Sequence, residues 1–225
     1  MNRKTYETIE TYMLSKMDDA AHDCQHIYRV LYMALDIAAH EAGADMDVLI
    51  AACLLHDIGR ERQYENPALC HAIEGGAMAY AYLARLGFGE ARARRVQQCV
   101  ASHRYRSEAP PESVEAKILF DADKLDAAGS VGIARTLQYG GRLGRPLYTL
   151  DDAWNVSDGA DTSTPSFFHE YHFKLKRVYN RLYTERGNQI AAARRQAAER
   201  FYDDLLGEVQ TAYVGGKALL AKNIS

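Results

Sequence analysis

The sequence predicts an all-α protein. Apolar residues recur at three- and four-residue spacing along almost the whole chain, which is the period of an amphipathic helix. The alternation of apolar and polar residues that marks a half-buried strand is nearly absent. Apolar residues make up 48% of the 225 residues, an ordinary share for a protein with a real hydrophobic core.

Five helices are expected in the first half of the chain. They cover about residues 3–16, Asp23 to Gly43, Asp45 or Asp47 to Asp57, 71–87 and 90–103. Asp23 and the two later aspartates are residue types that cap helix N-termini. The segment 60–69 is charged and contains Pro67, so we expect a loop there.

The second half begins with an expected sixth helix at 114–125, which Ser113 can cap after a break at two prolines. The remaining elements are, in order, a helix at 127–139, an irregular region at 140–165 and two long amphipathic helices at 166–184 and 188–208. The irregular region exceeds ordinary loops in length, and we interpret it as a lid or flap.

We expect one domain over residues 1–225, because no change in composition marks a boundary. It has a core at about 18–140, the irregular loop, and a C-terminal helical extension at about 166–212. The extension could pack on its own subunit or on a second copy, so a homodimer is one alternative.

Charge and cysteine content exclude several classes of protein. The formal net charge is −3, with acids and bases interspersed, which argues against binding a nucleic-acid polymer through a basic surface. The four cysteines form no C-x-x-C pair and are typical of reduced thiols in a cytoplasmic protein. No signal peptide and no apolar run long enough to span a bilayer is visible, so we expect no membrane partner.

The strongest chemical signal lies in residues 51–60, where an apolar run leads into adjacent His56 and Asp57. Burial of the run carries this imidazole and carboxylate inward, where both can reach one cation. Gly59 suits the left-handed conformation that ends a helix. A lone His-Asp pair is more often a buried histidine bonded to its neighbour, so the rest of the chain decides between the two interpretations.

Other histidines and acids lie at helix ends or on inward faces. They are His22, His26, His71, His103, Asp121, Asp123 and Asp126. Mixed His and carboxylate ligands suit divalent Mn, Fe, Zn, Ni or Mg. Asp123 and Asp126 share a helix face, and buried carboxylates are costly unless they are paired or bind a cation. The alternatives are core histidines with backbone partners and a solvated acidic helix end.

The order His26, His56-Asp57, Asp123 resembles the H…HD…D signature of the HD-domain superfamily of metal-dependent phosphohydrolases. The segments 26–30, 54–59 and 122–125 are similar to its first-histidine helix, its naming motif and its last-ligand helix. The chain also resembles a subgroup of small bacterial HD proteins whose substrates are largely unassigned. The segments that carry this resemblance are His22-Asp23, 121–127, 132–136, 139–141 and 172–175.

The resemblance implies an HD-domain helical bundle with one divalent metal held by His26, His56, Asp57 and Asp123. For His71 and His103 it implies one of two roles: ligands of a second metal that Asp57 bridges, or contacts to the substrate phosphate. Asp57 can also orient the attacking water or accept its proton. Lys124 is the best candidate for a phosphate contact, and the further candidates are Arg29, Arg60 and Arg104.

The expected function is hydrolysis of a phosphoester or phosphoanhydride bond in a small molecule by metal-activated water. A nucleotide is the expected substrate class. The alternatives are a non-hydrolytic sensor that binds metal and nucleotide, and a structural helical protein with buried histidines.

Overall fold

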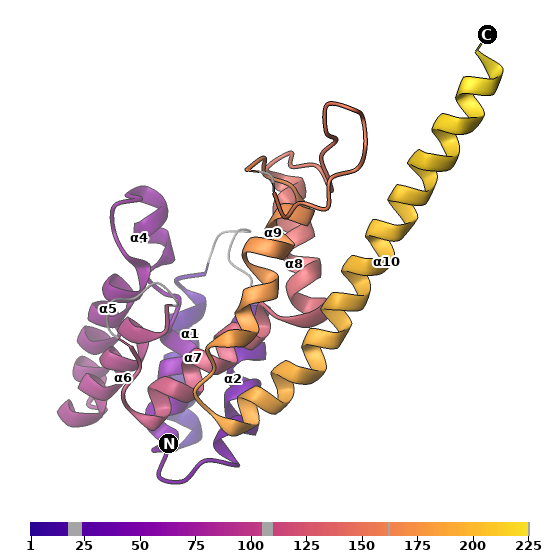
Figure 1. Ribbon diagram of the computed structural model, residues 1–225. Helices are drawn as coiled ribbons and strands as arrows, with labels where there is room; N and C mark the ends of the chain where they lie inside the picture. Colours follow the sequence, from indigo (N-terminus) through magenta and orange to yellow (C-terminus); the bar gives the residue numbers. More distant parts are fainter. Residues whose placement is uncertain (18–23, 105–109, 162, 225) are drawn as a thin grey trace. The chain divides into compact units, whose positions relative to one another are not determined.

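A computed structural model describes residues 1–17, 24–104, 110–161 and 163–224 and confirms the all-α class (Figure 1). The regular elements of these residues are helices, accompanied by one isolated bridge between Leu150 and Val156. The chain divides into two compact units: Met1–Asp126 with Leu182–Asn188, and Ala127–Arg181 with Gln189–Ser225. The single domain expected from the sequence stays a prediction.

Unit 1 contains the helices that carry the expected site residues. They are α1 (Arg3–Leu14), α2 (Cys24–Ala38), α3 (Met46–Leu55), α4 (Arg60–Glu65), α5 (His71–Leu86), α6 (Glu90–Ser102) and α7 (Val114–Asp126). Most bounds agree with the helical periodicity. The exceptions are α4, which forms where a loop was expected, and the end of α2, at Ala38 instead of Gly43. Ser113 accepts a hydrogen bond from the Ala116 N–H (3.2 Å) at the start of α7, as its capping role requires.

Helix α3 is the centre of unit 1. Residues Ala51 to Leu55 are fully buried, and α3 contacts α1, α2, α5, α6 and α7. Asp45 caps the helix by accepting hydrogen bonds from the N–H groups of Asp47 (3.0 Å) and Val48 (3.4 Å). His56 and Asp57 follow this helix directly, so the most buried element of the unit carries them inward.

Gly59 has a different role from the one expected. Its φ is −88°, so it does not end α3 in the left-handed conformation, and the chain continues into α4. A Cβ at this position would lie 2.2 Å from the carbonyl oxygen of His71 and 2.5 Å from the backbone nitrogen of Gly75. Gly59 is therefore needed for the close approach of α5 to the turn that carries His56 and Asp57.

We expect Gly59→Ala to destabilise unit 1 by about 2 kcal/mol or more, because the added methyl group overlaps backbone atoms that cannot move independently. Gly207→Ala is a matched control, since nothing lies within 4 Å of the Cβ it adds. The control should gain slightly from the better helix propensity of alanine. Thermal and urea denaturation measure both changes. Equal stabilities of the two variants would contradict the close-approach role.

Unit 2 contains α8 (Gly129–Arg142), α9 (Phe167–Phe173), the 3₁₀ helix η1 (Leu175–Asn180) and most of α10 (Glu185–Asn223). Its core is largely aromatic: Tyr171 stacks on Tyr202 with ring centroids 4.0 Å apart, and Phe168 packs against Tyr202. Between α8 and α9 the described residues, 143–161 and 163–166, form no helix, in agreement with the expected irregular region. Its role as a lid stays a prediction.

The C-terminal helices differ from the expectation. The helix expected at 166–184 is replaced by α9 and η1, because the helical conformation is interrupted before α10. Asp121 accepts hydrogen bonds from the N–H groups of Tyr183 (2.9 Å) and Thr184 (2.7 Å), and Thr184 Oγ1 accepts one from the Gly187 N–H (3.0 Å). These bonds set the start of α10. Asp121 is thereby a structural residue.

Helix α10 also extends well beyond residue 208, to Asn223. Gly215 and Gly216 weaken the helical pattern there, but alanine, leucine and lysine around them are strong helix formers. No helix of the described chain combines the length and apolarity needed to cross a membrane. The four cysteines are unpaired, as expected; Cys53 and Cys99 are buried.

Candidate metal centre

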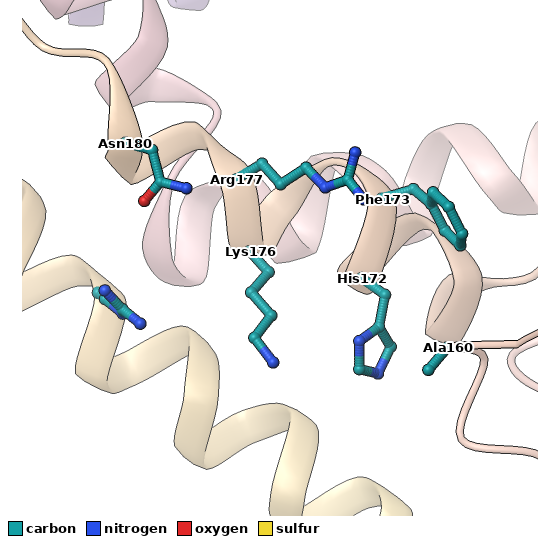
Figure 2. Close-up of a pocket in the computed structure, with 7 residues that line it drawn as sticks. Ala160, His172, Phe173, Lys176, Arg177 and Asn180 are labelled. Atoms are coloured by element: carbon teal, nitrogen blue, oxygen red, sulfur yellow. The ribbon is translucent and has the colours of Figure 1, made fainter.

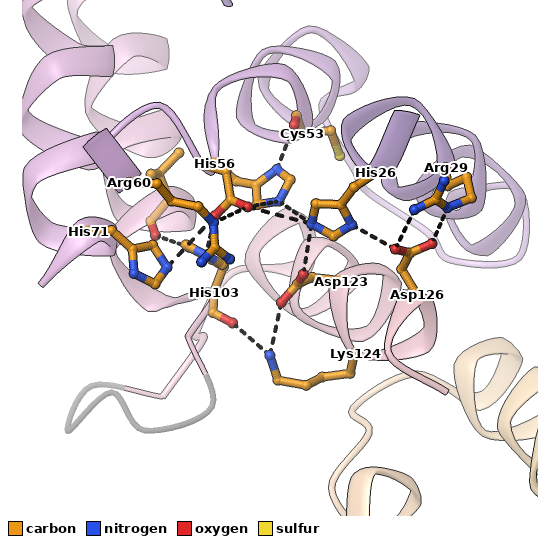
Figure 3. A network of polar contacts seen from close by, with 12 residues as sticks. His26, Arg29, Cys53, His56, Arg60, His71, His103, Asp123, Lys124 and Asp126 are labelled. Atoms are coloured by element: carbon orange, nitrogen blue, oxygen red, sulfur yellow. Dashed lines mark hydrogen bonds and ion pairs between the residues drawn. The ribbon is translucent and has the colours of Figure 1, made fainter. Parts of the chain in front are cut away.

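Three expected ligands from separate parts of unit 1 meet at one place (Figure 3). His26 comes from α2, His56 follows α3, and Asp123 lies on α7. His26 Nε2 is 3.3 Å from His56 Nε2 and 3.4 Å from Asp123 Oδ1. Nitrogen and oxygen ligands that bind one cation at about 2.0–2.2 Å lie roughly 3 Å apart, so these atoms are close to the spacing of a shared metal. Each could offer one ligand atom to it.

The carboxylate of Asp57 lies beside this group and extends it. Its Oδ2 is 3.5 Å from His26 Nε2 and 3.6 Å from His56 Nε2. Its Oδ1 is 3.7 Å from His71 Nε2 and 3.6 Å from His103 Nε2. Asp57, His71 and His103 form a second set that could hold a cation. One oxygen of Asp57 therefore faces each set, an arrangement that suits a bridging carboxylate.

All four imidazole rings are held through Nδ1, with an oxygen acceptor 2.6–2.8 Å away. The acceptors are Asp126 Oδ2 for His26, the Cys53 carbonyl for His56, Gln63 Oε1 for His71 and the Val100 carbonyl for His103. A ring whose Nδ1–H donates to oxygen has, when neutral, its lone pair on Nε2. The four Nε2 atoms are the ones that face Asp57.

The carboxylate of Asp57 is buried and incompletely satisfied. Its Oδ1 has no hydrogen-bond partner among the described residues, although the side chain is almost completely inaccessible. Burial raises the pKa of Asp57, but Arg60 and the surrounding histidines hold it well below its usual range, so the group is ionised. A buried ionised oxygen without a donor is costly, and a bound cation would remove that cost. The residues present thus fit a divalent metal.

Three histidines of the cluster differ in the direction in which their pKa is shifted. Burial lowers the pKa of His56 to about 4, and burial with nearby Arg60 lowers that of His71 to about 3. Burial also acts to lower the pKa of His26, but the hydrogen bonds that His26 donates to Asp123, Asp126 and Asp57 outweigh it and raise the pKa to about 10. His26 therefore carries the proton that balances the carboxylates, and a metal would compete with that proton.

Two of the expected phosphate contacts border the cluster. Arg60 Nε is 2.6 Å from Asp57 Oδ2, and Lys124 Nζ is 2.9 Å from Asp123 Oδ2. Lys124 also donates to the carbonyl oxygen of His103 (3.4 Å). Both cations therefore lie beside a candidate metal ligand and add positive charge there.

The other two arginines are engaged differently. Arg29 pairs with Asp126 through two bonds, Nε to Oδ1 at 2.6 Å and Nη2 to Oδ2 at 3.1 Å. The same carboxylate accepts the Nδ1–H of His26, so Arg29 acts on the cluster through Asp126. Arg104 donates to the sulfur of Cys70 (3.4 Å).

Two residues that support the cluster were not expected to act as supports of the metal ligands. Asp126 was one of three candidate acids, and its spacing from Asp123 already placed it on the correct face. Gln63, the acceptor for His71, lies in a segment expected to be a loop, so no periodic signal pointed to it. His22 and Asp23, which resemble a subgroup motif, lie outside the described residues.

With this geometry in place, comparison with known proteins identifies the class. Residues 24–128 match the family model of the HD domain, the segment that supplies every candidate ligand. This match confirms the resemblance of the motifs to the HD-domain superfamily.

Particular relatives agree over most of the chain. YpgQ of Bacillus subtilis (strain 168) is 29% identical over 208 residues, which cover 90% of this chain and 92% of YpgQ. The crystal structure of YpgQ in complex with ADP is similar with a TM-score of 0.71 and 28% identity, over 91% of this chain and 95% of that one. An HD-superfamily hydrolase from Bacillus thuringiensis gives a TM-score of 0.71 at 29% identity, over 92% and 97%.

Proposed function

We propose that this protein is a metal-dependent phosphohydrolase that cleaves a phosphoester or phosphoanhydride bond of a small molecule, with nucleotides as the favoured substrate class. The observation that carries the proposal is the carboxylate of Asp57, buried and ionised, with the Nε2 atoms of four histidines around it. Similarity to an HD-superfamily hydrolase supports the reaction class. The complex of the similar protein YpgQ with ADP supports the nucleotide.

In this proposal His26, His56, Asp57 and Asp123 hold a divalent cation. Mn, Mg, Fe, Ni and Zn all suit this mixture of imidazole and carboxylate ligands. A cation bound there lowers the pKa of a coordinated water and offsets charge on the phosphoryl oxygens. His71 and His103 would either hold a second cation together with Asp57 or bind a phosphoryl oxygen.

The remaining roles belong to the side chains around the ligands. In this proposal Asp57 Oδ1 orients the attacking water and accepts its proton, and its lack of a hydrogen-bond partner among the described residues supports this role. Arg60 and Lys124 bind phosphoryl oxygens, since each lies beside a ligand carboxylate and each side chain keeps some contact with solvent. In this proposal Arg29 binds Asp126 and does not contact the substrate.

The test is a hydrolysis assay with the purified protein, each candidate metal in turn, and a panel of nucleoside mono-, di- and triphosphates with a generic phosphoester. We expect turnover with at least one pair of metal and substrate, and loss of turnover in His56→Ala. Activity that persists in a His56→Ala, Asp57→Ala double variant would contradict the proposal. Nucleotide that raises the Tm but is recovered intact with every metal would favour the sensor alternative.

A further inference from the structure

Unit 2 contains a cleft of about 390 Å³ that the proposed hydrolysis does not use (Figure 2). Its lining includes His172, Phe173, Lys176, Arg177, Asn180 and Arg195. Lys176 and His172 point into the space between the α9–η1 segment and α10 (Figure 2). Three of the lining side chains are cations, and none of the described residues that form the cleft is Asp or Glu. The volume lies within the range of roughly 300–1,000 Å³ that small-molecule sites occupy.

The cations of this cleft are only partly neutralised. Arg195 pairs with Glu199 (2.8 Å), as many exposed arginines of the chain do with an acid. Within the described part of the chain, Lys176 and Arg177 form no ion pair. The stretch 172–181 contains four lysines and arginines and no acid. Like charges held together repel one another, and a bound anion would relieve that repulsion.

The base of the cleft is held by the core of unit 2. Leu175 is buried, and Tyr171 next to His172 stacks on Tyr202. Tyr202 donates its hydroxyl hydrogen to the Asp158 carbonyl oxygen (2.6 Å). His172 Nε2 lies 2.9 Å from the Tyr202 hydroxyl oxygen and therefore donates to that hydroxyl. The side of the α9–η1 segment that faces the core of unit 2 is therefore fixed. Less conformational entropy is then lost when the side that lines the cleft binds a ligand.

The charged rim is partly ordered as well. The guanidinium of Arg177 lies over the ring of Phe173, 5.3 Å from its centroid. Such cation–π contact holds the planar group in place and leaves its N–H donors available. A guanidinium binds two oxygens of one phosphate at once, and an ammonium such as that of Lys176 adds a third donor.

We propose that this cleft binds a small phosphate-bearing anion through Lys176 and Arg177, with Arg195 and Asn180 as further donors. The cationic lining selects a ligand that is multiply charged and offers mainly acceptors, as phosphate and pyrophosphate do. All lining residues belong to unit 2 and all candidate metal ligands to unit 1, so the proposal does not rest on the hydrolytic one.

The test uses the full-length protein treated with a chelator, so that no metal is available to bind phosphate in unit 1. Calorimetric titration with pyrophosphate should show binding that weakens as salt is added. The double variant Lys176→Ala, Arg177→Ala should lose at least tenfold in affinity. The matched control is Lys174→Ala, Arg200→Ala, which also removes one lysine and one arginine, both exposed and outside the cleft.

A second comparison separates the two units. Pyrophosphate binding should persist in Lys124→Ala, because Lys124 belongs to the metal centre. If AMP binds more tightly than pyrophosphate, and if its binding is also lost in the double variant, the phosphate that the cleft binds belongs to a nucleotide. No binding to the wild-type protein, or equal affinity of the double variant and its control, would overturn the proposal.

Discussion

Replacing Asp57 with Asn is expected to abolish metal-dependent hydrolysis and to remove the stabilisation that metal gives the wild-type protein. The carboxylate presents one oxygen to His26 and His56 and the other to His71 and His103. Asparagine keeps the shape but has no charge, and its NH₂ group must face one of the two sets of imidazoles as a donor. Metal affinity should fall by more than about 100-fold, because removing a residue that only supports a metal ligand already lowers metal affinity by about 10–100-fold.

Metal content of the purified protein and the Tm with and without added metal measure this effect directly. A metal at 100 times its Kd adds about 2.7 kcal/mol to the stability of the protein that binds it. Wild-type protein should show that gain and Asp57→Asn should not. Asp36→Asn is the matched control, since Asp36 is partly exposed, lies outside the cluster and pairs with Arg186. A wild-type Tm response to metal in Asp57→Asn would show that Asp57 is not a ligand.

The location of the candidate ligands was largely predictable from sequence. The apolar run 51–55 had to be buried, and His56 and Asp57 follow it without a break. His26 and Asp123 each lie on a helix face that also carries apolar residues, so burial turned them inward as well. Helical periodicity is a local property of the chain, which is why it located these residues and most helix bounds.

The supports of the cluster were not predictable in the same way. The acceptors for His56 and His103 are backbone carbonyls, which any residue supplies, so no side-chain pattern can mark them. The role of Gly59 depends on the approach of α5, a tertiary contact that turn chemistry alone does not reveal. The break before α10 likewise depends on Asp121, more than sixty residues earlier in the chain.

Replacing Asp126 with Asn should weaken metal binding by about 10–100-fold although Asp126 faces away from the proposed metal. Its Oδ2 accepts the Nδ1–H of His26 at 2.7 Å and so directs the Nε2 lone pair of that ring toward Asp57 and Asp123. The amide of asparagine can instead donate to Nδ1, which favours the tautomer with hydrogen on Nε2. That tautomer cannot bind a cation through Nε2. Calorimetric titration with Mn²⁺ gives the change in Kd.

Arg29 provides the control that separates positioning from substrate contact. It holds Asp126 through two bonds, so Arg29→Ala should weaken metal affinity in the same direction as Asp126→Asn but by less, because the carboxylate remains. Arg29→Lys should restore part of the loss, since one ammonium can replace one of the two bonds. If Arg29 contacted the substrate instead, its loss would raise KM at saturating metal and leave the Kd for Mn²⁺ unchanged. The two measurements on one variant therefore decide whether this arginine acts on the substrate or, through Asp126, on His26.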